Sequence, residues 1–135
     1  MDIEEIKKEL SRLSKPQLEK FIQNLDHVTF SFKINMSFLK YGAHPTTIPK
    51  EFYDFITMHG IETNRDLRIL FPDGSTAGGY IYKGRAGWGQ YFQIKVKQTS
   101  LQTGMGVSQF KVGDHIKVEI FKSADGENIK LSRIS

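Results

Sequence analysis

The chain has 135 residues, of which 39% are hydrophobic and 25% charged, proportions that are typical of one soluble globular domain. It contains no cysteine, which excludes disulfide bonds, a thiol nucleophile and cysteine-bound metal centres. The first residues lack the basic start and apolar run of a secretory signal, and no segment approaches the roughly 20 apolar residues that span a bilayer. We therefore expect a cytoplasmic protein without membrane contact.

The net charge of +4 is unevenly distributed along the chain. Residues 27–100 contain nine Lys and Arg against five Asp and Glu, whereas the two flanking parts are nearly balanced. Within this middle part, residues 27–50 and 83–97 contain basic residues and no acid. Such clusters favour a polyanionic partner, although solvated strand faces would give the same pattern.

Residues 1–26 predict two helices. Ser14-Lys15-Pro16-Gln17 resembles a capping box with proline in the first turn, and it separates two amphipathic segments. The second helix is expected to end near Asn24–Asp26. The pair should form a helical hairpin that packs on the main body, with an oligomerisation surface as the alternative. The first apolar stripe consists of Ile3, Ile6, Leu10 and Leu13.

From His27 the apolar residues alternate with polar ones, which predicts a strand that continues to Met36. A proline-initiated short helix is expected over residues 50–56, and a loop or weak helix over 98–109. Seven short strands with intervening helices predict a mainly β (α+β) fold, an open seven-stranded β-barrel over residues 27–135 preceded by the N-terminal helical extension 1–26. The other strands are predicted at 46–48, 67–71, 79–82, 92–96, 115–121 and 128–134.

The sequence contains no recognisable catalytic constellation. Its four histidines occur singly, without a second ligand at metal-binding spacing. Glu5-Ile6-Lys7 has the Glu-x-Lys spacing of metal-dependent nucleases, but it lies on a predicted helix with no strand-borne acid before it. Gly84-Arg85-Ala86-Gly87 matches the Gly-x-x-Gly loop of RNA-binding KH domains, but it lies between predicted strands rather than helices. We expect no catalytic residue, no metal and no cofactor in this chain.

A glycine-rich, acid-free loop is predicted between the fourth and fifth strands. Arginine can read guanine bidentately, glutamine can pair with adenine, and lysine or a tyrosine hydroxyl can hold a phosphate. The alternative is that the aromatic residues anchor the core and the cations are solvated; for Tyr82 and Phe92 we expect the core. The candidate DNA contacts in this loop are Lys83, Arg85, Trp88, Gln90 and Tyr91.

A second acid-free loop is predicted at residues 37–47, after the first strand. Its hydroxyl and cationic side chains suit DNA contacts, while Phe38 and Leu39 could simply be packed. Its candidate contacts are Lys40, Tyr41, His44 and Thr46.

Several short motifs follow one another along the second part of the chain: Ile48-Pro49-Lys50, Leu67-Arg68-Ile69-Leu70, the Pro72-Asp73-Gly74 turn, the loop with Trp88, and Val112-Gly113-Asp114. In this order and spacing they resemble the DNA-binding pseudobarrel family, which includes the plant B-three transcription-factor domain and the recognition domain of EcoRII-type restriction endonucleases. The resemblance covers about residues 27–135. It implies two arms in the major groove, one around residues 40–47 and one around 83–91, while residues 1–26 have no counterpart in the family pattern.

The leading hypothesis is therefore sequence-specific binding of double-stranded DNA, by a small regulator or by the recognition domain of a restriction enzyme whose nuclease domain or subunit lies elsewhere. A β-barrel that binds a small ligand or a protein partner, with Trp88 and Tyr91 lining a pocket, is the first alternative. A non-catalytic portion of a larger enzyme is the second.

Overall fold

The computed structural model describes residues 2–40, 46–63, 66–97, 110–122 and 128–134, and it is mainly β. The predicted loop or weak helix at 98–109, and residues 41–45 of the predicted loop at 37–47, lie outside the described residues. The strands are β1 (His27–Lys33), β2 (Thr46–Thr47), β3 (Leu67–Leu70), β4 (Thr76–Ala86), β5 (Gly89–Val96), β6 (His115–Phe121) and β7 (Ile129–Arg133).

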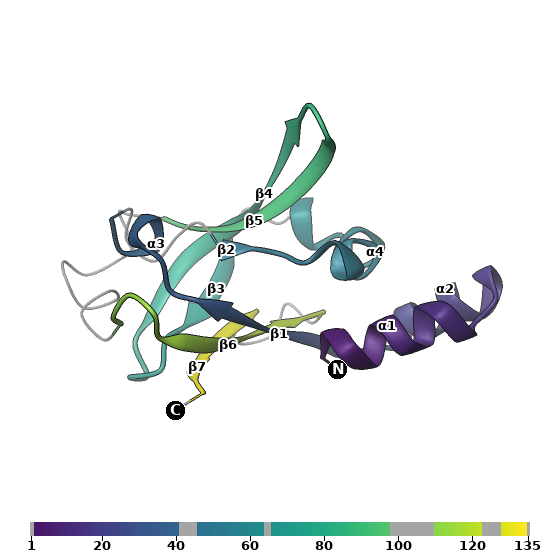
Figure 1. Cartoon of the computed structure of the whole chain (residues 1–135), viewed down its shortest axis with the longest axis horizontal. Helices are drawn as coiled ribbons and strands as arrows, with labels where there is room; N and C mark the ends of the chain where they lie inside the picture. The colour runs from purple at the N-terminus through teal and green to yellow at the C-terminus, as the bar shows by residue number, and fades with distance from the viewer. Residues whose placement is uncertain (1, 41–45, 64–65, 98–109, 123–127, 135) are drawn as a thin grey trace.

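The strands form one seven-stranded sheet in the order β1-β6-β7-β3-β4-β5-β2. Every neighbouring pair is antiparallel except β3 and β7, which are parallel. The sheet curves into a nearly closed barrel, with β1 and β2 at its two edges (Figure 1). The predicted open barrel preceded by a helical hairpin is thus confirmed.

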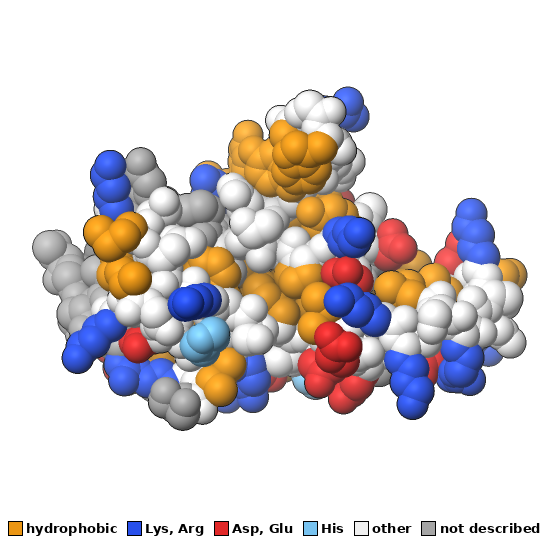
Figure 2. Space-filling view, viewed as in Figure 1, with side chains coloured by type: hydrophobic (Ala, Val, Ile, Leu, Met, Phe, Trp, Pro, Cys, Tyr) orange, Lys and Arg blue, Asp and Glu red, His pale blue; other side chains and the backbone are white. Residues whose placement is uncertain are grey.

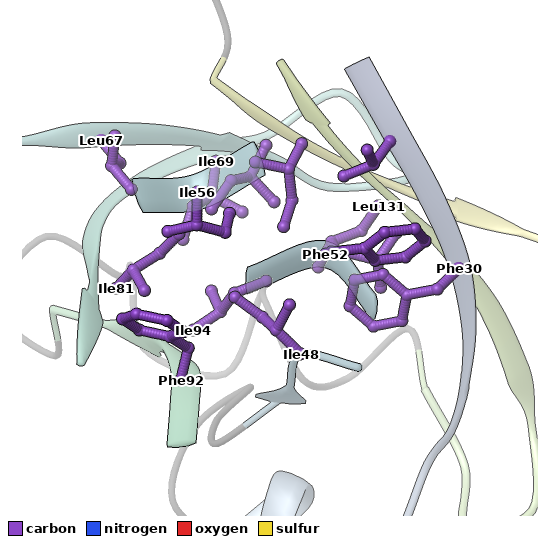
Figure 3. Close-up of a cluster of buried hydrophobic side chains, with 14 of the residues drawn as sticks. Phe30, Ile48, Phe52, Ile56, Leu67, Ile69, Ile81, Phe92, Ile94 and Leu131 are labelled. Carbon is purple, nitrogen blue, oxygen red and sulfur yellow. The ribbon is translucent and has the colours of Figure 1, made fainter. Parts of the chain in front are cut away.

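Side chains fill the interior of the barrel. Along β6, Ile116, Val118 and Ile120 are fully buried and alternate with polar residues, which is the pattern of a strand with one face on the core. The 3-10 helix η1 (Lys50–Phe52) and helix α4 (Tyr53–Met58) add apolar side chains to this interior. Figure 3 shows the resulting cluster, in which Phe30, Ile48, Phe52, Ile56, Leu67, Ile69, Ile81, Phe92, Ile94 and Leu131 point toward one another.

The N-terminal helices α1 (Ile3–Arg12) and α2 (Lys15–Gln23) form a hairpin that extends from one end of the molecule (Figure 1). The backbone N–H of Ser14 donates to Gln17 Oε1 at 3.0 Å, which is one half of the predicted capping box. Ile6 and Ile22 are buried, and the carbonyl of Ile22 lies 3.2 Å from His59 Nε2 at the end of α4. Within the described residues, no helix is long and apolar enough to span a bilayer.

The first strand is shorter than predicted. It ends at Lys33, and Met36 begins the short helix α3 (Met36–Lys40) with its side chain 69% exposed, so its assignment to the strand is wrong. Asn35 explains the change, because its Oδ1 accepts the backbone N–H of Phe38 at 2.8 Å and so caps the helix. The first part of the predicted loop 37–47 is therefore helical, and Phe38 is buried.

Candidate nucleic-acid interface

The projecting part of the molecule is the β4–β5 hairpin, which rises from the barrel in Figure 1. Its strands pair without interruption from Gly79↔Val96 to Ala86↔Gly89, leaving a two-residue turn of Gly87 and Trp88. Gly89 has a φ of 132°, a conformation that L side chains rarely adopt. The prediction of an irregular loop over residues 83–91 is wrong, because all of these residues except the turn lie in paired strands.

One face of the hairpin continues the core-facing side of the sheet. Its side chains change from buried and apolar to exposed and polar where the hairpin leaves the barrel. Ile81 and Ile94 are paired and buried, and alternation places Lys83 and Arg85 on the same face further out. Gln90 pairs with Arg85 across the hairpin and also lies on this face. We call the exposed residues Lys83, Arg85 and Gln90 the polar face.

No carboxylate forms an ion pair with Lys83 or Arg85 in the part of the chain that the structure describes. The two strands and their turn, residues 76–96, contain three cations and no acid. By contrast, Lys97 just beyond β5 is paired with Asp66 at 2.8 Å, and this ammonium group lowers the pKa of the Asp66 carboxyl. The positive charge of the polar face is thus uncompensated by its own hairpin.

The opposite face of the hairpin carries aromatic rings in contact. The ring centroids of Trp88 and Tyr91 are 5.7 Å apart, and those of Tyr91 and Tyr82 are 6.1 Å apart. Lys95 Nζ lies 5.4 Å from the centroid of the Tyr82 ring. We call Tyr82, Trp88 and Tyr91 the aromatic face. Figure 2 shows hydrophobic side chains gathered on the hairpin, with a Lys or Arg side chain at its tip.

The aromatic residues of the hairpin differ in whether they are exposed or buried. Trp88 is 75% exposed at the turn, while Phe92 is buried and packs edge-on against Tyr53 with ring centroids 4.9 Å apart. The prediction of Phe92 as a core residue is therefore confirmed. The same prediction for Tyr82 is wrong, because successive residues of a strand face opposite ways and Ile81 occupies the inward position.

The second predicted arm is only partly described. Lys40 is exposed at the end of α3, and α3 lies on the same side of the barrel as the hairpin in Figure 1. Thr46 lies in β2 opposite Ile94 and is 2% exposed, so its side chain is not presented at the surface. Thr47 is exposed instead. Tyr41 and His44 lie outside the described residues.

The described hollows on the surface lie away from the aromatic face. One of about 490 Å³ lies between the Phe71–Gly74 turn and β7, and another of about 400 Å³ lies between α2 and α4. Neither is lined by Trp88 or Tyr91. Among the described residues, no group of three or more histidine or acidic side chains is arranged to hold a metal ion.

Comparison with known proteins adds no assignment: no family model matches the chain, and a search of curated proteins finds no relative.

Proposed function

We propose that this chain binds double-stranded DNA in a sequence-specific manner, with the β4–β5 hairpin in the major groove. The observation that carries the proposal is the polar face, where two cations and an amide are exposed on a projecting two-stranded ribbon with no acid of its own. The major groove is about 12 Å wide and admits a ribbon of this kind. Clustered cations also provide the sequence-independent part of DNA affinity by displacing counterions.

Within this proposal, Arg85 and Gln90 are the residues that read bases. They are direct cross-strand partners, and such partners have Cβ atoms about 5 Å apart. Because base pairs are stacked about 3.4 Å apart, the two side chains would reach the same or adjacent base pairs. Arginine is suited to the O6 and N7 atoms of guanine, and glutamine to the N6 and N7 atoms of adenine.

Lys83 lies two residues closer to the barrel, about 7 Å along the strand, and we assign it to the phosphate backbone. We assign a second backbone contact to Lys40 and its neighbours Tyr41 and His44, on the strength of the family resemblance. Thr46 is omitted because it is buried. The resemblance also supports a role as the recognition domain of a restriction enzyme, with the nuclease in another domain or subunit, or as a small regulator.

The test is a selection of bound sequences from a library of randomised duplexes. We expect the wild-type chain to enrich one short motif, and the double variant Arg85→Ala, Gln90→Ala to lose that enrichment while keeping its fold. The matched control is Lys130→Ala, which removes an exposed charge from β7 and should enrich the same motif. Failure of the wild-type chain to enrich any motif would reject the proposal and favour a protein or small-molecule partner.

A further inference from the structure

The aromatic face of the hairpin is not used by the proposed reading of duplex DNA, because it points away from the polar face. Trp88 is 75% exposed and Tyr82 39% exposed. Single exposed apolar residues are common on protein surfaces, but here three aromatic rings touch in a row along one face of a projecting ribbon. A surface of this kind favours a ligand that presents flat rings of its own.

The position of the central ring in this row depends on the backbone opposite it. Tyr91 is the cross-strand partner of Gly84, and a Cβ added to that glycine would lie 2.2 Å from Tyr91 Cζ. The tyrosine ring thus lies directly over the bare backbone of the facing strand, an arrangement that protects a glycine within a sheet. The rings on either side pack against Tyr91, so the row is formed before any ligand arrives.

The charges around the aromatic face identify the class of ligand. Lys95 lies on the aromatic face, where its ammonium group is over the ring of Tyr82, and the hairpin contains no acid. Lys83 and Arg85 belong to the opposite, polar face. Exposed aromatic rings beside cations are the combination that binds single-stranded nucleic acid, where bases stack on the rings and cations follow the backbone. A protein partner would need a strongly acidic surface to match the same hairpin.

We propose that the aromatic face is a stacking platform for unpaired nucleobases, with Trp88 as the principal stacking residue and Tyr82 and Tyr91 extending the surface. The ligand is a single strand, or an unpaired segment beside a duplex. Lys95 supports the sugar-phosphate chain at the end of the platform nearest the barrel. This inference does not depend on the polar face: binding of single strands would stand even if the chain read no duplex sequence.

The chain carries its own probe for this binding, because Trp88 is the only tryptophan. A base stacked on an indole ring quenches its fluorescence, so the full-length chain should lose emission when titrated with a short oligothymidylate. An oligonucleotide of equal length built from abasic sugars has the phosphates without the bases, and it should cause no quenching. Oligouridylate in a parallel titration distinguishes RNA from DNA as the single strand. Equal quenching by the abasic strand, or none by either base-bearing strand, would overturn the proposal.

A second experiment measures the binding of labelled oligonucleotides to variants of the chain by fluorescence anisotropy. Trp88→Ala should weaken binding of the single strand by about 5- to 150-fold, the range measured for loss of one stacking ring, while binding of duplex changes much less. Arg85→Ala should show the opposite preference. Met36→Ala removes an apolar side chain of similar exposure, 69% against 75% for Trp88, outside the hairpin and should change neither affinity.

Tyr82→Leu is the second variant, and it covers the case in which Trp88→Ala alters the fold, which thermal melting would detect. Unchanged affinity of both variants for the single strand would reject the platform. An equal loss of single-strand and duplex affinity in both variants would also reject it, because one shared surface would then bind both ligands.

Discussion

Replacing Arg85 with alanine should reduce DNA affinity without disturbing the fold. The side chain is exposed, forms no ion pair within the described residues and lies beyond the barrel core. Surface substitutions of this kind change the free energy of unfolding by no more than about 0.5 kcal/mol. Any larger loss of DNA binding is then a property of the interface.

The magnitude depends on what the guanidinium contacts. If Arg85 reads a base, the substitution should cost about 1–3 kcal/mol on the cognate duplex, or about 5- to 150-fold in Kd, and much less on a scrambled duplex. If it contacts only phosphate, both affinities should fall by one factor and the slope of log K against log salt should become shallower by about 0.9. Arg85→Lys should restore little of the cognate affinity, because an ammonium group lacks the planar fork of guanidinium.

The assay is fluorescence anisotropy with cognate and scrambled duplexes at several salt concentrations, after melting curves have shown an intact fold. Lys33→Ala and Lys97→Ala are the matched controls, since each also removes one positive charge. Lys33 lies on the edge strand β1, whereas the hairpin lies next to the opposite edge strand, β2. Lys97 is already paired with Asp66. Both should change the two affinities slightly and equally. A loss of affinity that is equal for the two duplexes in Arg85→Ala would refute base reading by this residue.

Three other outcomes test the structure more widely. Affinity for any duplex should fall steeply with salt, with a log–log slope near −0.9 for each phosphate neutralised, and a flat dependence would contradict an interface based on cations. Asn128→Ala should lower the free energy of unfolding by about 1–3 kcal/mol in denaturant titration, because the buried Asn128 Oδ1 accepts the backbone N–H of Arg68 at 2.8 Å and the substitution leaves that donor unsatisfied. NMR titration should place the pKa of Asp66 below its ordinary value of 3.8, because the Lys97 ammonium group favours the carboxylate. The stabilisation from this ion pair should therefore be complete above pH 3.8 and should be lost as the pH falls through the pKa of the folded state. Lys97→Met should raise the pKa of Asp66 toward 3.8.

Much of the fold could be predicted from periodicity alone. The alternation in β6 and the 3-4-3 spacing in α1 are local signals, and both elements occur where they were expected. The short helix after Pro49 is likewise confirmed, because proline at a helix start and three apolar residues at helical spacing act within one turn. The pairing order of the strands could not be read from the sequence, because it depends on contacts between distant segments.

The hairpin shows why the candidate site was harder to predict than the fold. Glycines among cations indicate a loop, since glycine weakens the interior of a strand. Gly84 nevertheless lies within β4, because the ring of Tyr91 covers it from the facing strand, and only the register reveals that pairing. The register places Arg85 on one face, and the ring contact with Tyr91 places Trp88 on the other. The sequence alone presents the two residues as neighbours in one group of contacts.

The length of the hairpin can vary independently of the packing inside the barrel. Beyond Ile81 and Ile94 its inward side chains are no longer fully buried, except Phe92, and its two strands run in register to a two-residue turn. Facing residues can therefore be removed or inserted in matched sets near the tip without repacking the interior, and each residue changes the length by about 3.4 Å. Adding two residues to each strand preserves which side chains share a face. The distance that the hairpin projects from the barrel can thus change without a change in the stability of the barrel.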